Sequence, residues 1–120
     1  CFLFRIIMAN VFVNKKVDLT TTNATTLYTV PSATTAIVKS ILVSDDSGSG
    51  STITIQIVTS LEATFSVAHQ KTISANTPTE ILTNPLIVET GEIVKVTAGN
   101  ANRLHVILSA MQVTPRTVTT

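Results

Sequence analysis

Apolar and polar positions alternate along most of the chain. In the stretch "STITIQIV" (51–58), Ile53, Ile55 and Ile57 fall on one side and the polar residues between them on the other. A period of two is the pattern of a β-strand with one buried face. Helical spacing is hard to find, because no window of about a dozen residues keeps apolar positions at i, i+3, i+4 and i+7. The pattern therefore predicts an all-β protein.

One hairpin is predicted near the middle of the chain. Residues 35–44 are the expected partner of residues 51–60, and the polar stretch "DDSGSGS" (45–51) is the expected mobile tip between them. By strict alternation Val38 and Ile41 fall on opposite faces, so both faces of residues 35–44 are largely apolar. A strand of this kind is expected at the centre of a sheet or beneath another layer.

Further strands follow from the same alternation, and turn residues separate them. Pro31 ends one strand, Gly91 marks a tight turn that needs a positive φ, and Asn102 tolerates the left-handed region. Turns recur at intervals of roughly 8–12 residues, which is typical of an antiparallel β-sandwich or a jelly-roll-like fold. The remaining strands are expected at residues 11–19, 24–30, 62–69, 71–74, 80–82, 86–89, 92–98 and 103–113.

The length of 120 residues fits one domain. We expect a single β-sandwich domain over residues 8–114, with an N-terminal extension or arm at 1–7 and a frayed tail at 115–120. The stretch "CFLFRII" (1–7) has two interpretations: a segment that does not belong to the native domain, or an arm that packs on a neighbouring subunit. An exposed stretch this apolar favours aggregation, so an arm would have to be covered by another chain.

The composition is poor in charge. Charged residues make up 12% of the chain, hydrophobic residues 44%, and threonine fills 22 positions. Threonine suits a pleated surface without adding charge, so we expect neighbouring subunits to cover much of the surface. The net charge of +1 gives no field that would attract nucleic acid or an anionic membrane. Lys15 and Lys16, an adjacent basic pair, are interpreted as protection of a strand edge.

Residues that could carry chemistry are few and scattered. Asp45 and Asp46 are adjacent, whereas a calcium loop spaces its carboxylates at alternate positions, so a solvated turn is favoured. His69 and His105 are the two histidines, and neither lies beside a nucleophile motif. A single cysteine and two histidines also disfavour a zinc site. We therefore predict no catalytic residue, no metal site and no cofactor, and a protein that is not an enzyme.

Three segments resemble a known group of proteins. They are "MANVFVNKK" (8–16), "TLYTVPSATTAIVKSILVSD" (26–45) and "ETGEIVKVTAGNANRLHVILSAMQV" (89–113), and together they are similar to small virion structural proteins of tailed bacteriophages. The resemblance spans nearly the whole chain from Met8, but it consists of strand patterns and contains no catalytic signature. It implies a β-sandwich that coats or cements a capsid, or that sits in the tail or its fibres. Residues 1–7 depart from the pattern.

The predicted function is that of a capsid decoration or cement protein on the phage head surface. The expected partners are the major capsid protein or other virion proteins and further copies of the chain, for instance in a trimer, and no nucleic acid or membrane. A tail, baseplate or fibre component is the alternative. A carbohydrate-binding module shares the sandwich, but tryptophan is absent. The residues expected to make contacts are Phe2, Leu3, Phe4, Ile6, Ile7, Val11, Phe12, Val13, Asp45 and Asp46.

Overall fold

The chain folds into nine strands in the part that the structure describes. This computed structural model describes the backbone of residues 4–119 and the side chains of residues 10–114. No helix is found between residues 4 and 119. The strands are β1 (Phe4–Leu19), β2 (Thr25–Thr29), β3 (Thr35–Asp45), β4 (Ser51–Val58), β5 (Thr64–Ile73), β6 (Pro78–Glu80), β7 (Leu86–Val88), β8 (Ile93–Ala98) and β9 (Leu104–Thr119).

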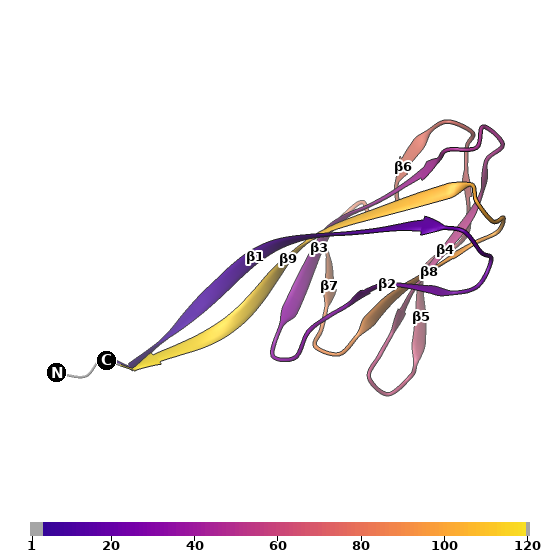
Figure 1. Cartoon of the computed structure of the whole chain (residues 1–120). Helices are drawn as coiled ribbons and strands as arrows, with labels where there is room; N and C mark the ends of the chain where they lie inside the picture. Colours follow the sequence, from indigo (N-terminus) through magenta and orange to yellow (C-terminus); the bar gives the residue numbers. More distant parts are fainter. Residues whose placement is uncertain (1–3, 120) are drawn as a thin grey trace.

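The strands form two sheets that pack face to face (Figure 1). The first sheet has the order β1-β9-β3-β6, and β7 also pairs with β3. The second sheet has the order β2-β8-β4-β5. Every strand pair is antiparallel. The predicted all-β antiparallel sandwich is thus confirmed.

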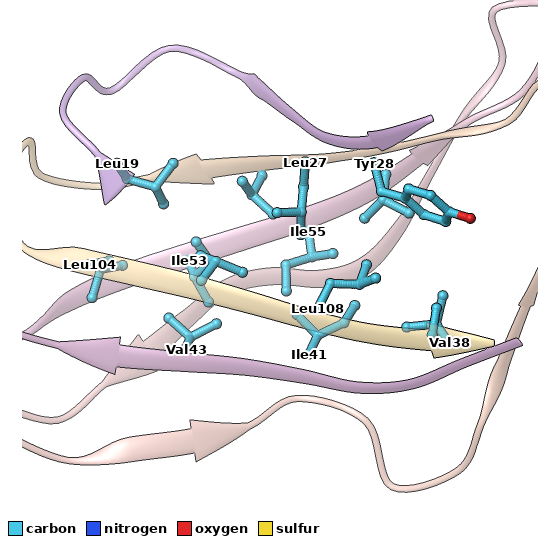
Figure 2. Close-up of a cluster of buried hydrophobic side chains, with 14 of the residues drawn as sticks. Leu19, Leu27, Tyr28, Val38, Ile41, Val43, Ile53, Ile55, Leu104 and Leu108 are labelled. Carbon is cyan, nitrogen blue, oxygen red and sulfur yellow. The ribbon is translucent and has the colours of Figure 1, made fainter. Parts of the chain in front are cut away.

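Aliphatic side chains from both sheets fill the space between them (Figure 2). Ile53 and Ile55 of β4 are fully buried, and Ile41 of β3 and Leu108 of β9 meet them from the opposite sheet. Burying one side chain of this size contributes about 1.5–3 kcal/mol relative to leaving it exposed. The buried residues of this core run in sequence from Leu19 to Ala110. They include many of the apolar positions in the alternating segments.

The predicted hairpin between β3 and β4 is wrong. β3 belongs to the first sheet and β4 to the second, so residues 46–50 carry the chain across the sandwich instead of turning it back. The physical reason lies in Asp45, whose carboxylate accepts hydrogen bonds from the N–H groups of Gly48 and Gly50. These bonds direct the chain away from β3 before a hairpin ladder can form. Alternation alone indicates strands, not which strands pair.

A β-bulge in β3 changes the faces that strict alternation assigns. The register with β9 shifts between Val38 and Ser40, so Val38 and Ile41 both point into the core and are fully buried. The carboxylate of Glu80 holds the bulge, since it accepts hydrogen bonds from the Ile41 N–H at 2.9 Å and from the Ser40 hydroxyl. Such bulges bend a strand and re-aim its side chains. β3 therefore has one buried face along its whole length.

Two smaller boundaries also differ from the sequence prediction. The break expected at Gln70 is a bulge inside the continuous strand β5, where Gln70 has a φ of 47° and its N–H donates to the Thr54 hydroxyl. The short strand expected at 80–82 lies at Pro78–Glu80. Proline is tolerated there because β6 lies at the edge of its sheet. The positive φ expected at Gly91 is confirmed.

β1 and β9 are longer than predicted. The strands expected at 11–19 and 103–113 extend over Phe4–Leu19 and Leu104–Thr119, and they pair from Phe4 opposite Thr119 to Leu19 opposite Leu104. The tail that was expected to fray is therefore paired as far as Thr119. The division into 1–7, 8–114 and 115–120 stays a prediction, although both boundaries fall inside continuous strands.

Candidate interaction surface

The far ends of β1 and β9 extend beyond the sandwich as a two-stranded ribbon. β3 pairs with β9 as far as Val113, so residues 4–9 and 114–119 pair only with each other among the described residues. We call these residues the terminal ribbon. Six residues of antiparallel strand span about 20 Å, and the whole chain measures 65 × 28 × 23 Å. Figure 1 shows the ribbon leaving the body, with Phe4 and Thr119 at its far end.

Side-chain contacts join the two sheets at the point where the terminal ribbon begins. Tyr28 of β2 is buried, and its hydroxyl accepts a hydrogen bond of 2.7 Å from the Gln112 side-chain amide of β9. The Lys15 ammonium of β1 lies 6.0 Å from the centroid of the same ring. This distance permits a weak cation–π attraction. These contacts tie the end of the second sheet to the first sheet, and no second layer is described beyond them.

A row of four apolar side chains crosses the outward face of the first sheet. Phe12 of β1 lies opposite Met111 of β9, Met111 opposite Ile37 of β3, and Ile37 opposite Ile87 of β7. Phe12 is 76% exposed and Ile87 is 53% exposed. We call these four residues the apolar row. The next outward positions are mostly polar, and an apolar surface with a polar rim is typical of an interaction site.

Asp45 is buried, and its carboxylate faces the loop that follows it. Its carboxylate accepts hydrogen bonds from the Ser47 hydroxyl at 2.7 Å and from the N–H groups of Ser47, Gly48, Gly50 and Asn76 at 3.0–3.1 Å. The Ser47 hydroxyl is the largest cause that holds the pKa of Asp45 well below its usual range, burial opposes it, and the backbone N–H groups of Ser47, Asn76 and Gly50 lower the pKa further. Asp45 therefore fixes the crossing from β3 to β4.

His105 and two carboxylates lie together on the outward face of the first sheet. The His105 Nε2 atom is 3.3 Å from Asp18 Oδ1 and 4.0 Å from Asp46 Oδ2. A surface groove of about 420 Å³ adjoins them, lined also by Lys16 and Ile107. All three polar side chains are substantially exposed, so their attraction is screened by water. His105 thus points outward and has a carboxylate partner.

A second apolar surface lies at the turn between β4 and β5. Leu61 is 90% exposed and Phe65 is 62% exposed. Phe65 lies opposite Ile57 in the β4–β5 pair, at the end of the sheet. The sequence did not indicate this surface, because alternation alone cannot show which end of a strand is left exposed.

The structure places the predicted contact residues in different surroundings. Phe12 and Val11 are exposed, whereas Val13 packs partly against the core. Asp46 is exposed, whereas its neighbour Asp45 is buried. Phe2 and Leu3 lie outside the described residues, and the side chains of Phe4, Ile6 and Ile7 lie outside the described side chains. A contact role for the set stays a prediction.

In the part of the chain that the structure describes, no group of three or more His, Cys, Asp or Glu side chains is close enough to hold a metal ion. The same residues include no helix of the length and apolarity needed to cross a membrane.

Comparisons with known proteins give a weak likeness in shape. No protein-family model matches the chain, and no curated protein sequence matches it significantly. A chain of infectious bursal disease virus Gx strain has a TM-score of 0.49 and 13% identity, over 96% of this chain and 32% of that chain. A chain of the cyanophage Pam1 capsid asymmetric unit has a TM-score of 0.39 and 18% identity, over 92% and 86%.

Both similar structures are of viruses, but both TM-scores lie below 0.5. This chain spans about a third of the length of the first of them. The fold described above therefore rests on the strand order and register of this chain itself.

Proposed function

We propose that the chain is a non-enzymatic structural component of a virus particle, a decoration or cement protein that binds the capsid surface and stabilises it. The observation that carries the proposal is the terminal ribbon, residues 4–9 paired with 114–119. A two-stranded ribbon without a facing layer is marginally stable in water. A ribbon laid across a neighbouring subunit would gain the layer that it lacks.

The outward face of the first sheet supports the same proposal. The apolar row gives that face a contiguous apolar strip, with Phe12 and Ile87 more than half exposed. Interfaces between permanently associated subunits are more apolar than an ordinary surface. The low share of charged residues, 12%, also suits a protein whose surface is covered by neighbours. The sequence resemblance to small phage virion proteins, which coat a capsid or sit in a tail, supports a role in the particle.

The copy number and position of the chain in purified particles test the proposal. Quantitative mass spectrometry combined with electron microscopy of the particle is expected to find many copies distributed over the shell. A few copies at one vertex or along the tail would instead support a tail, baseplate or fibre component. Absence of the chain from purified particles would contradict a structural role in the virion.

Re-addition to particles that lack the chain tests the role of the ribbon. The full chain is expected to bind such particles and to raise the temperature at which they release their contents. A shortened chain of residues 10–113 lacks the terminal ribbon and keeps the core that the structure describes, whose buried residues run in sequence from Leu19 to Ala110. It is expected to fold but not to bind. Equal binding by the full and the shortened chain would show that the ribbon is not needed for binding to the particle.

A further inference from the structure

We propose that two copies of the chain pair through the outer edges of their β1 strands, antiparallel and about a two-fold axis at Phe12. β1 has β9 as its one strand neighbour among residues 4–119, so its other edge is free over sixteen residues. A long free edge is a template for pairing with another strand. The result would be one continuous sheet across both copies. The pairing is independent of the proposed virion role, because it is a property of the purified chain.

Lys15 and Lys16, which could protect this edge, point to opposite faces of the sheet: Lys15 to the side of the second sheet and Lys16 to the outward groove beside His105. Lysine on an edge strand can prevent pairing. The Lys15 ammonium, however, lies over the Tyr28 ring, on the second sheet. It is therefore directed across the sandwich, and the edge of β1 remains accessible beside it.

The faces of the sheet restrict the register of such a pair. Even-numbered residues of β1 such as Phe12 point outward, and odd-numbered residues such as Leu19 point to the core. A two-fold axis normal to the sheet keeps outward residues opposite outward residues, so the two position numbers must sum to an even value. For a strand of residues 4–19, the longest overlaps of this kind are centred on Val11, with a sum of 22, or on Phe12, with a sum of 24.

The register centred on Phe12 makes the better side-chain pairs. It places Phe12 opposite Phe12 of the second copy, Asn10 opposite Asn14, and Val11 opposite Val13. The register centred on Val11 places Phe12 opposite Asn10 instead. Aromatic pairs directly opposite each other stabilise a sheet, and mismatched apolar and amide groups do not. The geometry therefore favours the axis at Phe12.

The same register extends the apolar row. Phe12 is the end of the row at the edge of β1, and it is 76% exposed in the single chain. Pairing at Phe12 joins the rows of two copies end to end, from Ile87 of one copy to Ile87 of the other. The exposed Phe12 surface is then covered by its equivalent. A self-complementary contact of this kind is what a two-fold interface requires.

Charge does not oppose the pairing. With a sum of 24, Lys15 lies opposite position 9, an alanine, and Lys16 lies opposite position 8, a methionine. Asp18 lies opposite position 6, an isoleucine. No like charges face each other, which would destabilise adjacent strands. The alanine also leaves room beside Lys15.

Site-specific cross-linking tests the register. With Cys1 replaced by serine, Phe12→Cys is expected to cross-link to itself with a short bifunctional thiol reagent, since opposite Cβ atoms lie about 4.5–5.5 Å apart. Asn14→Cys alone is the matched control, because its two copies would be separated by about 14 Å along the strands. A mixture of Asn10→Cys and Asn14→Cys is expected to cross-link efficiently. Self-cross-linking of Asn14→Cys as strong as that of Phe12→Cys would overturn the register.

Sedimentation velocity over a concentration series tests the self-association itself. The unmodified chain is expected to dimerise, and Phe12→Lys is expected to weaken the dimer about tenfold or more, because it places two cations at the axis. Phe65→Lys is the control: it changes an exposed phenylalanine on β5, far from β1 in the strand order, and is expected to leave the dimer unchanged. A chain that stays monomeric, or a dimer that Phe12→Lys does not weaken, would refute the proposal.

Discussion

The two halves of the β1–β9 pair differ in what surrounds them. In the body, β9 continues the sheet to β3, and Leu104 and Leu108 are fully buried beneath the second sheet. In the terminal ribbon, the same two strands continue with the same antiparallel ladder but without a second layer or a third strand among the described residues. The backbone hydrogen bonds are alike in both halves. What differs is the second sheet, which faces the strands only in the body.

The difference separates two roles within one pair of strands. Burial, not the ladder, provides most of the stability of a sheet, so the body is expected to fold with or without the ribbon. We therefore propose that the ribbon contributes little to folding and serves contacts with other chains. The effect of a change on folding should therefore fall from the core of the body to the ribbon.

The largest effect is expected in the core of the body. Leu108→Ala removes a fully buried side chain of β9 and should lower the free energy of unfolding by about 2–5 kcal/mol, from lost burial and the cavity left behind. Met111→Ala, three residues further on the outward face, should cost about 0.5 kcal/mol. Denaturation in urea measures both. Equal losses of unfolding free energy in the two variants would contradict the burial of Leu108 in the core and the outward position of Met111.

The crossing from β3 to β4 should be the next most sensitive place. Gly50 has a φ of +72°, and a Cβ added there would lie 2.9 Å from the Ile73 carbonyl oxygen. Gly50→Ala should therefore cost about 2–3 kcal/mol, from backbone strain and overlap together. Gly48→Ala shares the positive φ, but its Cβ would make only an ordinary contact of 3.7 Å with the Asn76 side chain, so it should cost about 1–2 kcal/mol. Urea denaturation of the two variants separates backbone strain from steric overlap. A larger loss of stability in Gly48→Ala than in Gly50→Ala would contradict the overlap at Gly50.

Acid should act on the same crossing through Asp45. Its pKa is depressed in the folded chain, so its stabilising effect is complete above the unfolded-state pKa and is lost as the pH falls below about 4. Asp45→Asn should lower the melting temperature at neutral pH and make it less dependent on pH in the acid range. Asp46→Asn is the control, because Asp46 is exposed. If the melting temperatures of the unmodified chain and Asp45→Asn fell equally with pH across the acid range, this role of Asp45 would be ruled out.

The smallest effect on folding is expected from removing the ribbon. A chain of residues 10–113 should have a free energy of unfolding within about 1 kcal/mol of that of the full chain, because the core that the structure describes runs in sequence from Leu19 to Ala110. Circular dichroism and urea denaturation test this. A loss as large as that of Leu108→Ala would show that the ribbon is part of the folding unit.

The sequence predicted the strands better than their arrangement. Period-two alternation located most strands and the sandwich class, because side-chain periodicity is a local property. It could not reveal that Asp45 directs β3 and β4 into different sheets, since the donors include Asn76, which is distant in sequence. It also missed the bulge that turns Val38 and Ile41 to the same face, because Glu80 holds it from another strand.

The candidate surface could be predicted only in part. Phe12 and Val11 stood out as apolar residues near the start of a strand, and both are exposed. The apolar row depends on the registers of β1, β9, β3 and β7, which pair residues up to about a hundred positions apart, such as Phe12 and Met111. No local pattern contains that information.

Amide hydrogen exchange of the free and the assembled chain tests the central claim most directly. In dilute solution the amides of the terminal ribbon, residues 4–9 and 114–119, should exchange far faster than those of β9 from Leu104 to Ala110. On assembly, whether in the dimer or on particles, the ribbon and the outer edge of β1 should become protected while the core stays unchanged. Ribbon amides as protected as the core in the dilute monomer, or unaffected by assembly, would contradict the account.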